Sequence, residues 1–299
     1  MTTGTETTTA MTPSIEQESR WSRGPLYLAV GFVALLWTIP SLGLLINSFR
    51  EARSVRAEGW WNVLNPATFF DSATWTLGNY REVLDGGFSN AFANSLAVSI
   101  PAVVIPITIA AFAAYAFSWM RFPGRNTMFA IVVGLMVVPL QMALIPILRV
   151  YVSFDVTGTY PAVWLAHAGF GLPLAVYLLR NYMGSLPSSI MESANIDGAD
   201  HFTIFWRLVV PLSVPVLASF AIFQFLWVWN DYLVALIFLG QDPDVSVLTQ
   251  ELARLAGRGE GALNLLPAAA FVTMVLPMVV FFSLQRFFVR GLTAGSVKG

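Results

Sequence analysis

The chain has 299 residues, of which 56% are hydrophobic and only 11% are charged, and its formal net charge is −1. Soluble domains are roughly 25% charged, so this composition predicts a membrane protein. The absence of cysteine excludes disulfides and thiolate chemistry, and no basic block indicates a nucleic acid partner.

The first 24 residues are rich in Thr, Ser and Glu and contain no apolar stretch typical of a signal peptide, so we expect a polar tail. Uncharged apolar segments follow, each with the roughly 20 residues that a helix needs to cross a bilayer. These segments are 26–46, 90–120, 126–148, 156–179, 208–230 and 261–285. The sequence therefore predicts an all-α polytopic membrane protein with six transmembrane helices.

Arginine placement predicts the orientation of these helices. The short connections "MRFPGRN" and "QRFFVRG" are basic without acidic residues, which is typical of cytoplasmic loops. We therefore expect a multi-pass protein of the bacterial plasma membrane with both termini cytoplasmic. The expected parts are a cytoplasmic tail (1–24), a first helix (25–49), an extracytoplasmic loop (50–89), a five-helix core (90–288) and a cytoplasmic tail (289–299).

Two longer segments lie outside the membrane in this topology. The loop 50–88 contains several Trp and Phe residues, which are candidates for an interfacial aromatic shelf. Residues 241–260 are polar and include "LTQELARL", which has the pattern of a short amphipathic helix.

A polar segment, 185–208, interrupts the apolar chain on the predicted cytoplasmic side. Ser189 and Glu192 have the spacing of a capping box, Gly198 suits a left-handed helix end, and Asp200 suits the cap of a second helix. The sequence thus predicts two short helices joined at Gly198, which would form a rigid protrusion.

The segment "ESANIDGADHFTIFWRLVVP" resembles the E-A-A loop of binding-protein-dependent ABC importer permeases. The residues that match this motif are Glu192, Ala194, Asp197, Gly198 and Pro211, whereas Ser193 departs from the usual Ala. "WNDYLVAL" (229–236) and the tail "RGLTAGSVKG" (290–299) are similar to segments of sugar-importer permeases, the tail to that of the smaller maltose-type subunit. The resemblance covers about residues 90–299 and implies the type I ABC importer permease fold.

The resemblance also implies a function and partners. The chain would be one permease of a sugar importer, paired with a second homologous permease, an ATPase dimer and an extracytoplasmic sugar-binding protein. The sequence is consistent with a separate ATPase, because its one lysine, Lys298, precedes a glycine and so cannot complete a phosphate-binding GxxxxGK[ST] loop. We expect no catalytic residues, no metal and no cofactor in this chain.

In this family the E-A-A loop docks into a cleft on the ATPase. The resemblance therefore implies that Glu192 faces basic groups of the ATPase, that Gly198 permits the turn, and that Ile190, Phe202 and Phe205 fill the cleft. The C-terminal tail, with Gly295 and Lys298, is expected to reach the same interface.

A possible substrate path lies at the end of the fifth predicted span. Gln224, Trp227 and Asp231 share one helical face, and Asn230 adjoins them. An aromatic ring with hydrogen-bonding neighbours suits a sugar, but the same residues could instead fix a contact between subunits. His167 is more typical of close helix packing than of a ligand site.

Two other classes of protein are alternatives. An ion-driven secondary transporter would require several buried carboxylates or an internal repeat, and the spans contain neither. A membrane enzyme would require a catalytic cluster, which two separated histidines and an absence of cysteine do not supply.

Overall fold

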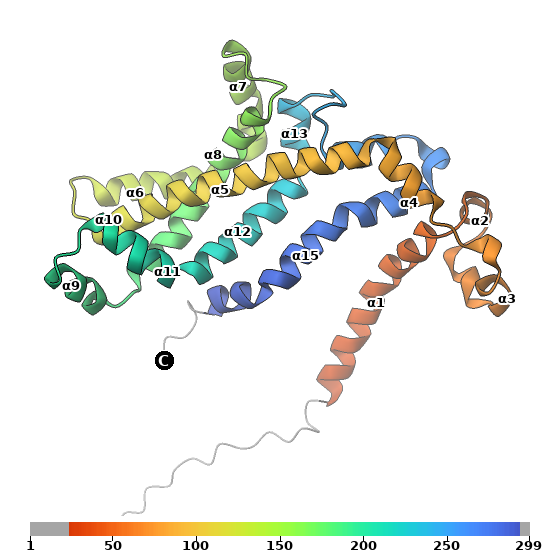
Figure 1. Ribbon diagram of the computed structural model, residues 1–299, viewed down its shortest axis with the longest axis horizontal. Helices are drawn as coiled ribbons and strands as arrows, with labels where there is room; N and C mark the ends of the chain where they lie inside the picture. The colour runs from red at the N-terminus through yellow and green to blue at the C-terminus, as the bar shows by residue number, and fades with distance from the viewer. Residues whose placement is uncertain (1–23, 294–299) are drawn as a thin grey trace, which may run out of the picture.

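The computed structural model describes residues 24–293, and within this range it is helical, with a single isolated β-bridge between Arg50 and Trp75. The first helix, α1 (Gly24–Ser48), spreads away from the other helices toward its N-terminal end (Figure 1). Short elements follow it: α2 (Ala52–Ala57), η2 (Trp60–Leu64), α3 (Pro66–Phe69), η3 (Ser72–Thr74), α4 (Gly78–Val83) and the π-turn η4 (Leu84–Phe88).

Three long helices form the centre of the protein: α5 (Ser89–Trp119), α8 (Tyr160–Gly184) and α12 (Val214–Trp229). α15 (Leu265–Thr293) packs along α12. Alanines are fully buried where α5 and α8 meet, and such small residues let membrane helices approach closely. Examples are Ala102, Ala110, Ala114, Ala162 and Ala175.

Proline shapes these helices without always breaking them. α5 continues through Pro101 and Pro106, as a membrane helix can when neighbouring groups satisfy the freed carbonyls. Between α6 (Arg125–Gly134) with η5 (Leu135–Val137) and α7 (Leu140–Ser153), however, the chain bends by 102° at Val138 and Pro139. The third predicted span is therefore two bent pieces and not one straight helix.

The fifth predicted span is also shorter than expected. The chain bends by 71° between the stretch that ends at Leu212 and α12, so the straight part begins at Val214 rather than at 208. Within residues 24–293, four helices are long and apolar enough to cross a membrane, and the count reaches six if each bent pair is one span. α15 extends to Thr293, past the expected start of the C-terminal tail at 289.

The remaining elements lie at the two ends of the central helices. α9 (Ser188–Ile196), α10 (His201–Ile204), the π-turn η6 (Phe205–Val209) and α11 (Val210–Leu212) connect α8 to α12 at one end. α13 (Leu233–Phe238), α14 (Leu248–Ala256) and η7 (Gly259–Ala262) lie at the opposite end of α12 (Figure 1). α14 coincides with the amphipathic helix predicted from "LTQELARL".

Candidate functional site

The polar segment forms two short helices with a closed turn between them, which we call the knob (residues 187–208). Gly198 has φ +78°. The N–H of Gly198 donates to the carbonyl of Asn195, and the N–H of Ala199 donates to that of Ala194. This is the Schellman pattern, which satisfies the last carbonyls of α9 and favours glycine at the left-handed position.

The two helices of the knob begin differently. The Asp200 carboxylate accepts a hydrogen bond from the Thr203 N–H at 2.9 Å, so Asp200 caps α10 as predicted. The expected capping box of Ser189 and Glu192 is wrong, because α9 begins at Ser188 after Pro187 and has no side-chain cap. Pro187 is the residue directly before α9.

Aromatic packing fixes the base of the knob to α5. The Phe205 ring is buried and stacks on Phe112, with 4.6 Å between centroids, and it meets the Tyr115 ring edge-on. The Tyr115 hydroxyl also lies 2.9 Å from Nδ1 of His201. Movement of the knob is thus tied to the end of α5 by apolar and polar contacts together.

Of the residues that match the motif, Ala194 faces inward. Ala194 and Met191 are buried in the same apolar cluster as Phe205. The expectation that Phe205 fills a partner's cleft needs correction, because its side chain is only 3% exposed and packs within this chain. Pro211, on α11, is exposed and cannot donate a backbone hydrogen bond to the carbonyl of Arg207.

The outward face of the knob combines carboxylates with apolar side chains. Glu192 and Asp197 are exposed. Ile196 is 86% exposed and Phe202 64% exposed. An exposed apolar patch next to carboxylates, at one end of the central helices, is suited to contact with another protein.

The predicted path residues form a packed polar cluster at the far end of α12. Gln224 is fully buried, and its amide donates to the backbone carbonyls of Ala102 on α5 and His167 on α8, at 3.2 Å each. Gly171 makes this possible, because a Cβ there would lie 2.5 Å from the Gln224 amide oxygen. In this conformation Gln224 joins three helices and is not exposed to a path.

Asp231 connects this cluster to the elements beyond α12. Its carboxylate accepts the N–H groups of Val234 and Ala235, which begin α13, and lies 3.8 Å from Nε2 of His167. Its carbonyl accepts the hydroxyl of Thr249 on α14. Trp227 meets the His167 ring edge-on at 5.2 Å, as helix packing would predict for this histidine.

A small cavity beside Asp231 is lined by Ser95, Ser99 and His167 among others, and its volume of about 10 Å³ is near the room that one water needs. Asn230 is exposed, and its amide donates to the carbonyl of Leu226 on its own helix. The cluster as described has no room for a sugar.

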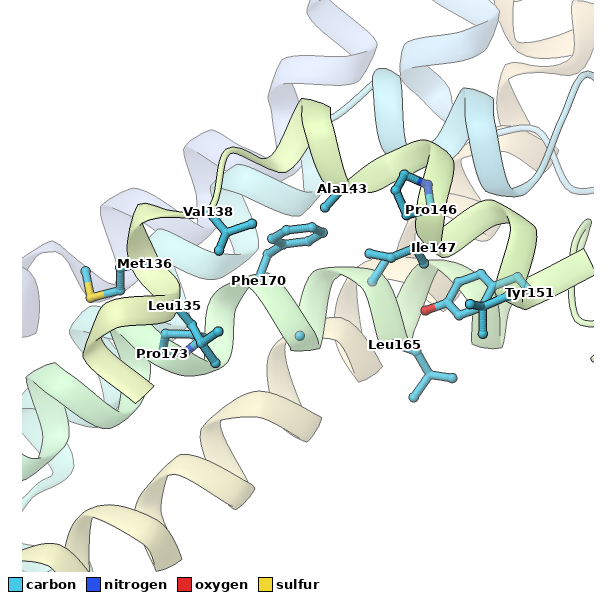
Figure 2. Close-up of a pocket in the computed structure, with 13 residues that line it drawn as sticks. Leu135, Met136, Val138, Ala143, Pro146, Ile147, Tyr151, Leu165, Phe170 and Pro173 are labelled. Atoms are coloured by element: carbon cyan, nitrogen blue, oxygen red, sulfur yellow. The ribbon is translucent and has the colours of Figure 1, made fainter. Parts of the chain in front are cut away.

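A larger apolar pocket lies between α8 and the bent α6–α7 pair. Its volume is 480 Å³, and Figure 2 shows Phe170 of α8 between Val138 and Ala143 on one side and Ile147 on the other. Its lining is almost entirely hydrocarbon, with Tyr151 the polar exception. A sugar needs hydrogen-bonding groups, so this pocket suits a hydrocarbon or a packed helix better than a sugar.

Sequence reasoning missed the contact of Tyr115 with His201, because 86 residues separate them and Tyr115 lies outside the quoted segment. It also missed Gly171 as the partner of Gln224. Gly295 and Lys298 lie outside the described residues. Among residues 24–293, no group of three His, Asp or Glu side chains could hold a metal ion.

Comparisons with known proteins agree on one family. Residues 106–294 match the model of the binding-protein-dependent transport system inner membrane component. The chain is 53% identical to the osmoprotective compounds uptake permease protein GgtD of Synechocystis sp., over 93% of both chains. It is 42% identical to the alpha-glucoside transport system permease protein AglG of Rhizobium meliloti, over 97% of this chain and 100% of that one.

A solved structure shows the same fold. A chain of a bacterial ABC transporter that imports the acidic polysaccharide alginate has a TM-score of 0.72, with 20% identity, over 93% of this chain and all of that one. The helices of residues 24–293 thus have the fold of an ABC importer permease. The matched family is one of transport permeases and not of enzymes. The chain belongs to the binding-protein-dependent transport system inner membrane component family and is a multi-pass permease subunit of an ABC importer.

Proposed function

We propose that this chain is one of two homologous permeases of an ATP-driven sugar importer, taking oligosaccharides or glycosides, and that the knob receives the movement of the ATPase dimer. The coupling role is supported by the structure of the knob, which has a packed base and an exposed apolar face. Its base is fixed to α5 by Phe205 and by the Tyr115–His201 hydrogen bond, while Ile196 and Phe202 stay exposed. A rigid base and an apolar outer face are what a force-transmitting contact requires.

The carboxylates of the knob complete this interface. Glu192 and Asp197 lie on the exposed face and would meet basic groups of the ATPase. Such rim charges select the partner and its orientation more than they add affinity. The tail with Gly295 and Lys298 would reach the same ATPase surface.

Sugars or glycosides are the proposed cargo because of the relatives. The name of one relative refers to alpha-glucosides, and that of a 32% identical protein of Halalkalibacterium halodurans refers to arabinooligosaccharides. A second alginate transporter structure, with a TM-score of 0.61 and 16% identity, includes a periplasmic protein with bound alginate pentasaccharide. An extracytoplasmic sugar-binding protein is accordingly a proposed partner here.

The orientation follows from the same proposal. The knob must lie in the cytoplasm, where ATP is available, so α13 and α14 face the outside and both termini are cytoplasmic. Asp231 would then act at the outer end of the core, where it fixes α13 and α14. Among the predicted path residues, Asn230 is already exposed and Trp227 is the half-buried one that an outward-opening movement would expose further.

The test is a substitution at Gly198 in the assembled transporter. Valine in a left-handed conformation costs roughly 1–2 kcal/mol, so Gly198→Val should distort the turn between α9 and α10. We expect the ATPase subunits to be lost on purification and ATP-dependent sugar uptake into vesicles to fall. Gly198→Asn should retain both, because asparagine tolerates this conformation.

The matched control is Gly158, which has φ +76° in the connection before α8, away from the knob. Gly158→Val carries the same local strain and should leave ATPase binding intact. Normal ATPase binding and uptake in Gly198→Val would show that the knob does not couple the subunits. Uptake driven by an ion gradient without ATP would contradict the ATP-driven mechanism itself.

A further inference from the structure

An uncharged aromatic segment, "WWNVLNPATFF" at residues 60–70, protrudes beside the end of α1. Charged residues flank it, with Glu51, Arg53, Arg56 and Glu58 before it and Asp71 after it. Its apolar side chains are nevertheless exposed: Trp61, Leu64, Phe69 and Phe70, the last at 81%. Exposed apolar groups gathered in this way need a partner.

Hydrogen bonds from a buried arginine stabilise a reversal of the chain direction after α1. The Arg50 side chain is fully buried, and its guanidinium donates to the carbonyls of Ser54, Glu58 and Gly59. Burying a guanidinium is costly unless its donors are paired, and the two terminal nitrogens of Arg50 are paired in this way while its Nε has no partner. The bonds of the terminal nitrogens stabilise the reversal that follows α2. Residues 60–70 therefore run back toward α1 and do not extend away from it.

The contact of Trp60 with α1 sets the level of residues 60–70 along the axis of that helix. Its indole packs on Gly43 of α1 so closely that a Cβ at Gly43 would lie 2.7 Å from Nε1. Gly43 precedes the helix end, Ser48, by five residues, or about 7.5 Å along the axis. The start of the segment thus lies beside the last turns of α1 and does not project beyond the C-terminal end of that helix.

Comparing the length of α1 with the thickness of the bilayer shows where Gly43 and Trp60 lie relative to the membrane surface. Its 25 residues extend over about 38 Å, whereas the hydrocarbon core is about 30 Å thick. Each end therefore reaches several ångströms beyond the hydrocarbon. Gly43, and with it Trp60, lies close to the boundary between hydrocarbon and headgroups.

Local hydrogen bonds prepare the segment for such an environment. Asn65 accepts the N–H of Ala67 and caps α3, and the Trp75 indole donates to the carbonyl of Phe69 at 2.8 Å. Backbone groups that are already paired can enter a less polar medium at little cost. Figure 1 shows α2 and α3, which flank η2 in the chain, grouped beside the end of α1.

We propose that residues 60–70 are a membrane anchor whose partner is the lipid interface at the C-terminal end of α1. Trp and Phe are favoured at this depth, and the segment has no charge that the interface would exclude. The anchor fixes α1, which otherwise spreads away from the core. The proposal rests on the position of Trp60 along the axis of α1. It does not depend on which substrate is transported or on whether the knob binds an ATPase.

Because the chain contains no cysteine, one position at a time can carry a label. Phe70→Cys is labelled with an environment-sensitive fluorophore in the assembled transporter in lipid nanodiscs. The cysteine-free chain in the same complex serves as the labelling blank. We expect a blue-shifted emission, strong quenching by nitroxide-labelled lipid and a loss of quenching by aqueous iodide.

The matched control is Ala57→Cys, an exposed position of the same loop in its charged part. That label should show the opposite pattern, with strong iodide quenching and little lipid quenching. Equal iodide quenching at both positions would overturn the proposal. So would a Phe70 label shielded from iodide but not quenched by lipid, or shielded only when the solute-binding protein is added, because each result means a protein partner.

Discussion

The hydroxyl of Tyr115 and Nδ1 of His201 lie 2.9 Å apart, which joins the last third of α5 to the first residue of α10. Phe205 packs on Tyr115 and Phe112 next to this hydrogen bond. A pull on the knob must therefore displace α5, the helix that makes the most extensive contact with α8. This contact gives the first prediction.

Tyr115→Phe removes the hydrogen bond but keeps the ring that Phe205 packs on. The bond is partly buried, and a hydrogen bond contributes about 1 kcal/mol, so we expect a several-fold loss of sugar transported per ATP hydrolysed while the ATPase subunits still bind. The measurement compares uptake with ATP hydrolysis in proteoliposomes. Tyr177→Phe, on an exposed face of α8, is the control. An unchanged ratio in Tyr115→Phe would mean that aromatic packing alone transmits the movement.

Gly171→Ala should destabilise the core, because the added Cβ collides with the Gln224 amide. If the amide moves, the carbonyls of Ala102 and His167 lose their donor, at a cost of about 1–3 kcal/mol. The measurement is thermal unfolding of the purified complex. Gly169→Ala is a close control, since it lies on the same helix and nothing lies within 4 Å of the added Cβ. Equal effects of the two substitutions would contradict the role of Gly171.

Gly43→Ala should loosen residues 60–70 from α1. The new methyl group would overlap the Trp60 indole, and overpacking of this kind typically costs about 1–3 kcal/mol. Faster protease cleavage within residues 51–70 would report the loosening. Gly31→Ala adds a methyl group to the same helix in open space and should cleave as the unmodified chain does.

The stabilisation of α10 by its cap, Asp200, should be lost only at acidic pH. Hydrogen bonds from the Thr203 side chain and backbone lower the pKa of Asp200 below its ordinary value. Because the folded-state pKa is the lower one, the cap's contribution is complete above the ordinary carboxyl pKa. It is lost only as the pH falls through the lowered value.

Hydrogen exchange at the Thr203 amide measures this dependence. Protection should persist from neutral pH down through the ordinary carboxyl range and decline below it. Asp200→Asn should remove the acidic decline, since an amide caps the helix without titrating. A decline that persists in Asp200→Asn would assign it to another group.

The sequence alone was sufficient for the class of fold and the position of the knob. Charge was so scarce, and the apolar segments so long, that a polytopic helical membrane protein was the consistent solution. Gly198 and Asp200 could be assigned because caps and left-handed turns depend on residues a few positions apart. The same locality explains why the amphipathic helix α14 was predicted correctly.

Only the tertiary structure decided which residues face inward. Phe205 and Phe202 look alike in sequence, but packing on α5 buries the first and leaves the second exposed. The pairing of Gln224 with Gly171 depends on a neighbour far away in the chain. From the sequence, Arg50 would be expected at the surface. It is buried because the backbone carbonyls of the loop that follows it accept its hydrogen bonds. The physical reason is that burial and hydrogen-bond pairing are properties of the folded arrangement, whereas helix ends and apolar length are encoded locally.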